Sequence, residues 1–216
     1  MTNRKPGLNR SFIIAIAVLS VLLVGFPLGS WYYLKAGLDY RKEVMGDLYD
    51  YGKMPAVVLT TSTGRALEPK DVAGKIIVAG FLNFQDQTVT KQSGQWLSKL
   101  HHQFNERRDV TFLLHVADTL ASAETLDAFA TQYQLQDTAQ CYFLKDNPEV
   151  FRTIATNVYK IPEDAINAHF ALTDAQGKVR RNYDLRQTSE INRLVEHIAL
   201  LLPRDNGRSV SGKTKE

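Results

Sequence analysis

The sequence has 216 residues, of which 44% are hydrophobic, and a formal net charge of +3. The excess positive charge lies at the two ends, and between Lys35 and Pro203 acidic residues outnumber basic residues by 21 to 19. Nucleic-acid binding requires clustered basic charge that displaces counterions, so this balance argues against nucleic acid as a partner. The length that follows an apolar N-terminal segment fits one globular domain.

Residues 11–34 contain no charged side chain. A hydrocarbon core needs about 20 apolar residues, so we predict a single transmembrane anchor here. Three basic residues within residues 1–10 place that end in the cytoplasm and the rest of the chain on the extracytoplasmic, periplasmic side of the cell membrane. A cleaved signal peptide is the alternative, but its apolar core would be shorter, and bulky side chains follow the best cleavage candidate, residues 27–30.

The first part of the predicted domain contains a buried strand and a helix. After a membrane-proximal segment, residues 35–55, the sequence predicts a short strand at residues 56–59 and a turn at residues 68–74. Residues 76–81 are apolar and predict a core strand, and apolar side chains at helical spacing predict a helix at residues 93–104. The polar residues 82–92 connect the two. In open α/β sheets such a loop is where ligands and reactive groups usually lie.

A second strand and helix follow, and then a hairpin and a terminal helix. In chain order we predict a strand at 110–116, a helix at 122–133, a strand at 141–144, a helix at 149–158, a strand at 169–173, a returning strand at 178–183 and a helix at 189–202. Gly177 in the connecting turn is placed where a positive φ is needed. Thr188 or Ser189 is the expected cap of the last helix. The polar residues 204–216 are predicted to be a disordered tail.

This order of elements is typical of the thioredoxin-like α/β fold. Residues 56–203 resemble the Sco/SenC family, through the Gly74-Lys75 entry to the first core strand, Phe81 at its end, the strand at Val110, and the run from Asn167 to Lys178. The family consists of membrane-anchored copper chaperones for cytochrome oxidase assembly. The resemblance therefore implies a thioredoxin-like domain on an anchor, and a membrane-protein partner such as a respiratory oxidase or its assembly machinery.

The resemblance also implies where copper would bind. The family's site joins a histidine at the start of a strand to two cysteines in a Cys-x-x-x-Cys motif after the first core strand. His169 fits the histidine, and alignment on Phe81 puts the cysteine positions at Asp86 and Thr90. Cu(I) prefers soft thiolate or thioether ligands, so this departure argues against tight Cu(I) binding.

Three interpretations of these residues stay open. Asp86 and His169 could hold a harder divalent metal ion weakly. His169 could instead be a histidine satisfied by backbone or water. Finally, Phe84, Asp86, Thr90 and His169 could form a groove that contacts another protein.

Cys141 is the only cysteine, so the chain cannot close an internal disulfide or run dithiol chemistry. We interpret it as an apolar core residue, with a reactive or intermolecular thiol as the alternative. His101 and His102 are interpreted as a solvated pair, and His115 and Met54 as packing residues.

Two classes of function therefore remain. The first is a non-catalytic interaction or assembly factor for a membrane respiratory complex, with no resident cofactor. The alternative is a copper-handling chaperone of Sco type with an altered ligand set, Asp86 and His169, or a thiol-dependent protein that uses Cys141. Peroxiredoxin-like reduction would need a cysteine after the first core strand, where this sequence has none.

Overall fold

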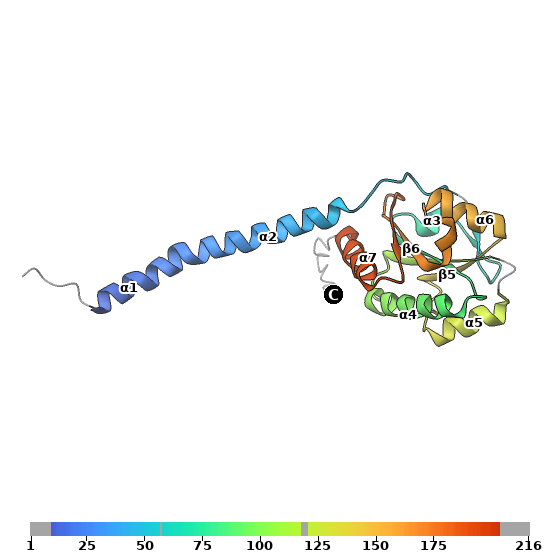
Figure 1. The fold of residues 1–216 in the computed structure, drawn as a ribbon, viewed down its shortest axis with the longest axis horizontal. Coiled ribbons are helices and arrows are strands. Elements are labelled where there is room, and N and C mark those ends of the chain that lie inside the picture. Colours follow the sequence, from blue (N-terminus) through green and yellow to red (C-terminus); the bar gives the residue numbers. More distant parts are fainter. Residues whose placement is uncertain (1–9, 57, 118–120, 204–216) are drawn as a thin grey trace, which may run out of the picture. The chain divides into compact units, whose positions relative to one another are not determined.

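The computed structural model describes residues 10–56, 58–117 and 121–203 (Figure 1). The chain divides into two compact units, Met1–Gly46 and Asp47–Glu216. Most of the predicted cytoplasmic segment and the whole predicted tail, residues 204–216, lie outside the described residues.

The first unit contains one long helix, made of α1 (Arg10–Ser20), a π-helical turn η1 (Val21–Gly25) and α2 (Phe26–Gly46). It is long and apolar enough to cross a membrane, and it includes the predicted anchor, residues 11–34. Phe26 N–H donates to Val21 O, which widens the turn directly before Pro27. Proline has no N–H to donate to the helical ladder, which accounts for an irregular turn at this point.

A five-stranded sheet forms the centre of the second unit, in the order β5-β4-β3-β6-β7. The strands are β3 (Ile76–Leu82), β4 (Val110–Ala117), β5 (Cys141–Asp146), β6 (His169–Thr173) and β7 (Val179–Asp184). β3, β4 and β5 are parallel, whereas β6 runs antiparallel to both β3 and β7. All residues of β3 and β4 are buried, because both faces of the sheet are covered.

Helices cover the two faces. The remaining elements of this unit are β1 (Leu59–Thr60), β2 (Ala66–Leu67), α3 (Pro69–Val72), α4 (Gln87–Phe104), α5 (Ala123–Gln132), α6 (Pro148–Thr153), η2 (Ile154–Val158), η3 (Glu163–Ala168) and α7 (Thr188–Leu201). α4 and α5 lie on the opposite side of the sheet from α3 and α6 (Figure 1). The first face packs against α4, α5 and α7, and the second against α6, η2, η3 and the β1–β2 hairpin.

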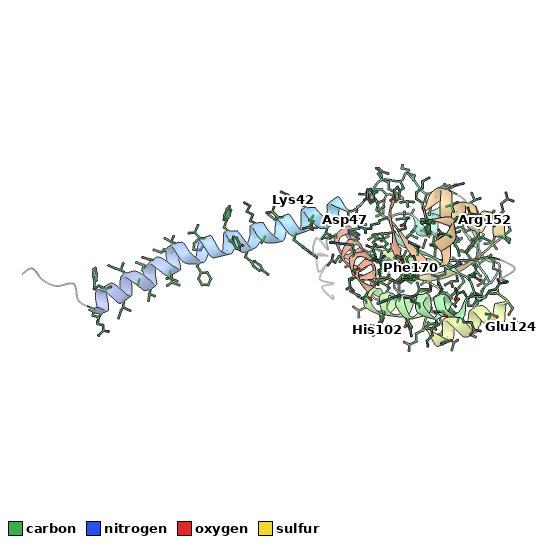
Figure 2. All side chains as sticks on the ribbon, in the orientation of Figure 1. Lys42, Asp47, His102, Glu124, Arg152 and Phe170 are labelled. Atoms are coloured by element: carbon green, nitrogen blue, oxygen red, sulfur yellow. The ribbon has the colours of Figure 1, made fainter. Side chains whose placement is uncertain are left out.

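Alternation along β3 produces these two faces. Ile76 and Val78 join the core under α4 and α7, whereas Ile77 and Phe81 point to the other side. Phe170 on β6 belongs to the first core and lies inside the domain (Figure 2). Every buried residue of the three hydrophobic clusters follows residue 47, so the second unit contains its own core.

Several predicted elements differ from the structure, among them the predicted turn at residues 68–74, which contains the short helix α3. Strand pairing near residues 56–59 begins only at Leu59, opposite Leu67, and Val58 is 63% exposed. Helix α4 begins at Gln87 and not at residue 93, because the side chain of Asp86 caps a helix start in the mostly polar residues 87–92. Helix α7 already includes Thr188, so neither Thr188 nor Ser189 caps it. The positive φ at Gly177, +75°, is confirmed.

Candidate functional site

The loop from β3 to α4 ends at the N-terminus of α4, where Asp86 is the capping residue. One carboxylate oxygen, Oδ1, accepts hydrogen bonds from the backbone N–H groups of Thr88 and Val89, both at 3.1 Å. These N–H groups would otherwise lack an intrahelical partner, and a carboxylate there also interacts favourably with the helix dipole. Asp86 therefore has a structural role at the first of the two positions that the resemblance assigns to cysteine.

The second position, Thr90, is also used locally. Its hydroxyl donates to the carbonyl oxygen of Asn83 at 2.6 Å, and the Asn83 side chain accepts from Gln85 N–H at 3.0 Å. These bonds tie the first turn of α4 to the end of β3. Polar side chains that satisfy the loop's own backbone thus occupy both aligned positions.

His169 begins β6, next to the end of β3, because the register pairs Gly80 with Phe170. The side chain is 8% exposed, and Nδ1 lies 2.9 Å from the carbonyl oxygen of Ala165. A carbonyl oxygen only accepts, so Nδ1 carries the proton and Nε2 of the neutral ring keeps its lone pair. The interpretation of His169 as a histidine satisfied by backbone therefore agrees with this bond, although Nε2 retains the chemistry of a metal ligand.

The residues at this site do not fit Cu(I). Asp86 and Thr90 offer hard oxygen atoms, and soft thiolate or thioether ligands are what Cu(I) prefers. Within the described ranges, Asp86 and His169 share no hydrogen bond or ion pair, and no group of three or more His, Cys, Asp and Glu side chains is arranged to hold a metal. A weak divalent site at Asp86 and His169 stays a prediction.

A groove lies beside this loop, between the start of α4 and helix α5. Its volume is about 680 Å³. Phe84 and Thr90, two of the four predicted groove residues, are in its wall, and Asp86 and His169 are not. The other lining residues are Gln87, Thr88, Lys91, Thr125, Ala128, Phe129, Gln132 and Tyr133. The ring of Phe84 packs edge-on against Phe129, with centroids 5.4 Å apart, so an aromatic floor is surrounded by polar side chains.

A glycine allows α4 and α5 to approach at this groove. A Cβ at Gly94 would lie 2.3 Å from the ring of Tyr133. Helix interiors normally disfavour glycine, so its place here is explained by the aromatic ring that packs on it. Gly94 therefore fixes where Tyr133 stands in the groove wall.

Cys141 lies at the start of β5, on the α4 side of the sheet. It is 5% exposed, and burial raises the pKa of its thiol to about 12, with a smaller effect of Asp137 in the same direction. The predicted burial is confirmed. A reactive thiol needs access and a lowered pKa, and Cys141 has neither.

The structure differs from the interpretation of two histidines, His101 as a solvated residue and His115 as a simple packing residue. His101 is half-buried against the ring of Phe112, and burial lowers its pKa, so only His102 is exposed. His115 is buried as predicted, but Nδ1 lies 2.7 Å from Oδ2 of Asp146 on the neighbouring strand. Because β4 and β5 pair His115 with Leu144, Asp146 is two residues along on the same face. An acidic residue at the end of a neighbouring strand was the only sequence signal for this pair.

No family model matches the chain, and no curated protein matches it. Among solved structures, a SCO1/SenC family lipoprotein from Bacillus anthracis is 24% identical with a TM-score of 0.58, over 69% of this chain and 94% of that one. The domain has the thioredoxin-like fold of Sco/SenC proteins. BsSco, described as a member of the Sco family of cytochrome c oxidase assembly proteins, is 15% identical with a TM-score of 0.54, over 71% and 94% of the two chains.

A third similar structure is ScoI from Bradyrhizobium japonicum, solved with copper bound. It is 17% identical with a TM-score of 0.52, and the match covers 70% of this chain and all of that one. The predicted fold class, a thioredoxin-like α/β domain, is therefore confirmed. The shared fold places the loop before α4, and with it Asp86 and Thr90, on a scaffold that Sco proteins also use.

Proposed function

We propose that this protein is a membrane-anchored, extracytoplasmic and non-catalytic interaction factor that assists the assembly of a membrane respiratory complex such as cytochrome oxidase. The Sco-type fold and the long apolar helix support this function, since BsSco is described as belonging to a family of cytochrome c oxidase assembly proteins. The anchor confines the domain to the membrane surface, which raises its effective concentration near a membrane partner.

One observation carries the non-catalytic part of the proposal. At the two positions aligned with the family's cysteines, the side chains of Asp86 and Thr90 are bonded to their own loop. The one thiol of the chain, Cys141, is buried and has a raised pKa. The scaffold is therefore retained while its exposed loop offers shape and hydrogen bonds in place of thiol chemistry.

The groove beside the loop is the proposed contact surface. Phe84 and Phe129 provide an aromatic centre, and Gln87, Lys91 and Gln132 provide a polar rim. Protein interfaces commonly combine such an apolar centre with a polar rim. A partner segment with one apolar side chain and flanking polar groups would fit this surface.

Recovery of partners from membranes in mild detergent tests this assignment. Ala128 is exposed and lines the groove, so Ala128→Arg places a long charged side chain in it. Ala123→Arg introduces the same side chain at an exposed position of the same helix outside the groove. We expect oxidase or assembly subunits to be recovered with the unchanged protein and with Ala123→Arg, and to be lost with Ala128→Arg. Equal recovery with both variants would contradict the groove assignment.

Copper competition titrations separate this function from the alternative. Cu(I) and Cu(II) are titrated into the unchanged protein, Asp86→Ala and His169→Ala. We expect no binding by the unchanged protein beyond that of the two variants. Stoichiometric binding that disappears in both would replace the proposal with a copper chaperone whose ligands include Asp86 and His169.

A further inference from the structure

A cavity of about 240 Å³ lies on the face of the sheet opposite the groove. Its wall is formed by α3, the β1–β2 hairpin, η2 and the turn before β7. The lining residues are mostly apolar, among them Leu59, Leu67, Val72, Ile77, Ile154 and Val158. Cavities of about 150 Å³ already hold benzene when their walls are apolar, so this space is large enough for a small organic molecule.

Several of the lining residues are buried, and two of these, His115 and Tyr159, carry polar groups. Ile77, His115 and Tyr159 are each at most 2% exposed. Nε2 of His115 is buried and has no hydrogen-bond partner among the described residues. A buried polar atom without a partner is unfavourable and rare, and ligand sites are a common place for one.

The His115 ring is held in a fixed orientation. Nδ1 bonds to the carboxylate of Asp146 at 2.7 Å, and the ring stacks on Phe81 with centroids 5.0 Å apart and planes 11° apart. Since a carboxylate oxygen accepts, Nδ1 carries the proton and Nε2 of the neutral ring offers a lone pair. The ring cannot turn to satisfy Nε2 without losing its bond to Asp146.

The second buried polar group of the wall, the hydroxyl of Tyr159, has a hydrogen-bond partner. The hydroxyl of Tyr159 donates to Sδ of Met54 at 3.3 Å, and burial raises the pKa of that hydroxyl, so it stays protonated. Met54 is half-buried and has a flexible thioether side chain, which makes it the adaptable part of the wall. Of these two buried polar side chains, His115 is the one with an atom, Nε2, that has no hydrogen-bond partner in the part of the chain that the structure describes.

We propose that this cavity binds a small, phenol-like molecule, with its apolar body among the aliphatic side chains and its hydroxyl group against Nε2 of His115. A hydroxyl both donates and accepts, so it pairs with this nitrogen in either protonation state. The volume limits the body to about the size of one substituted ring. This site is separate from the groove, and binding here involves none of the groove residues.

Methionine methyl spectroscopy of the full chain in detergent can test the site with phenol and toluene. The two molecules have similar shape and differ in one hydroxyl. The chain has three methionines, and Met54 lines the cavity, whereas Met45 lies on α2 and reports any effect of the detergent. We expect phenol to shift the Met54 methyl signal saturably and to leave Met45 unchanged. No Met54 shift with either molecule would overturn the proposal.

Two variants identify the contact. His115→Asn keeps a donor toward Asp146 and removes the group at Nε2, and His102→Asn is the matched exposed control. His115→Asn should weaken phenol binding about tenfold, which corresponds to the loss of one hydrogen bond. The affinity for toluene should stay unchanged. Detergent micelles also take up phenol and toluene, but to the same extent in every sample. The ratio of the affinities of two protein variants is therefore unaffected. Unchanged phenol affinity in His115→Asn would overturn the hydroxyl contact.

Val158→Phe tests the cavity independently of His115. Val158 is half-buried in the wall, so a larger side chain there occupies the space without removing the Asp146 pair. We expect both molecules to lose binding in this variant while the unfolding temperature stays close to that of the unchanged protein. Persistent Met54 shifts in Val158→Phe would show that phenol binds elsewhere.

Discussion

Replacing Asp86 with alanine removes the side chain that caps α4, and the size of the effect distinguishes a cap from a metal ligand. Asp86 Oδ1 accepts from two N–H groups at 3.1 Å, and the side chain is exposed, so its loss creates no cavity. Removing an N-terminal cap costs about 1 kcal/mol, within a range of about 0.5 to 2. The lost interaction between the carboxylate and the helix dipole adds about 0.3 to 1 kcal/mol.

Asp86→Asn gives the internal comparison, because it keeps the acceptor oxygen and removes the charge. Asp86→Ala should lower the free energy of unfolding by about 1 to 2 kcal/mol, and Asp86→Asn by about 0.5 kcal/mol. In a domain of this size, 1 kcal/mol corresponds to about 2 to 4 °C in unfolding temperature. Urea titration of the fragment of residues 35–203, followed by circular dichroism, measures both, and Asp127→Ala on the exposed side of α5 is the control.

Equal losses in Asp86→Ala and Asp86→Asn would refute the account, because the acceptor would then contribute nothing beyond the charge. No loss in Asp86→Ala would show that the cap does not form in solution. A ligand role predicts a different pattern, in which metal-free stability is unchanged by Asp86→Ala and only the stability gained from added metal disappears.

Three further outcomes follow from buried or paired groups. Cys141 should resist iodoacetamide at pH 8 in the native state and react fully in denaturant, as mass spectrometry would show, because burial raises its pKa to about 12; rapid native labelling would contradict this. Gly94→Ala should destabilise the domain by about 1 to 3 kcal/mol in urea titrations, since its Cβ meets Tyr133 at 2.3 Å; a stabilised variant would refute the contact. Bonds from Arg186 hold the pKa of Asp184 at about 2, below its ordinary 3.8, so the stability it adds is present above about pH 4 and is lost as the pH falls towards 2. Asp184→Asn should therefore destabilise at pH 7 and have a smaller effect at pH 2.5, and an equal effect at both would contradict it.

Strands were the most predictable part of this fold. The run from Ile76 is apolar without interruption, as expected for a strand covered on both faces, and β6 has the predicted bounds. The start of α4 differs from the prediction because five of its first six residues are polar and the cap at Asp86 is what favours a helix there. The sequence signal for this helix start is Asp86, because aspartate is a preferred N-cap residue. Interpreting the stretch as a loop in place of the family's cysteine motif conceals that signal.

The cavity lined by His115 could not be predicted from the local sequence pattern. His115 and Asp146 are 31 residues apart, and only the register of β4 on β5 brings them onto one face. The cavity wall also combines α3, η2 and the β1–β2 hairpin, whose packing depends on the whole fold. By contrast, Phe84 and Thr90 were predictable as groove residues because the loop after a core strand is a usual contact site.

The polar atoms on the two faces of the sheet differ in whether they have hydrogen-bond partners. At the loop before α4, the capping oxygen of Asp86 and the hydroxyl of Thr90 already have backbone partners, so recognition there depends on the shape and rim of the groove. On the other face, Nε2 of His115 has no hydrogen-bond partner among the described residues, and a ligand that supplies one would regain about 1 to 3 kcal/mol. The proposed protein-contact groove and the proposed ligand cavity thus use separate residues. Ala128→Arg should therefore leave the Met54 response to phenol intact, and Val158→Phe should leave partner recovery intact.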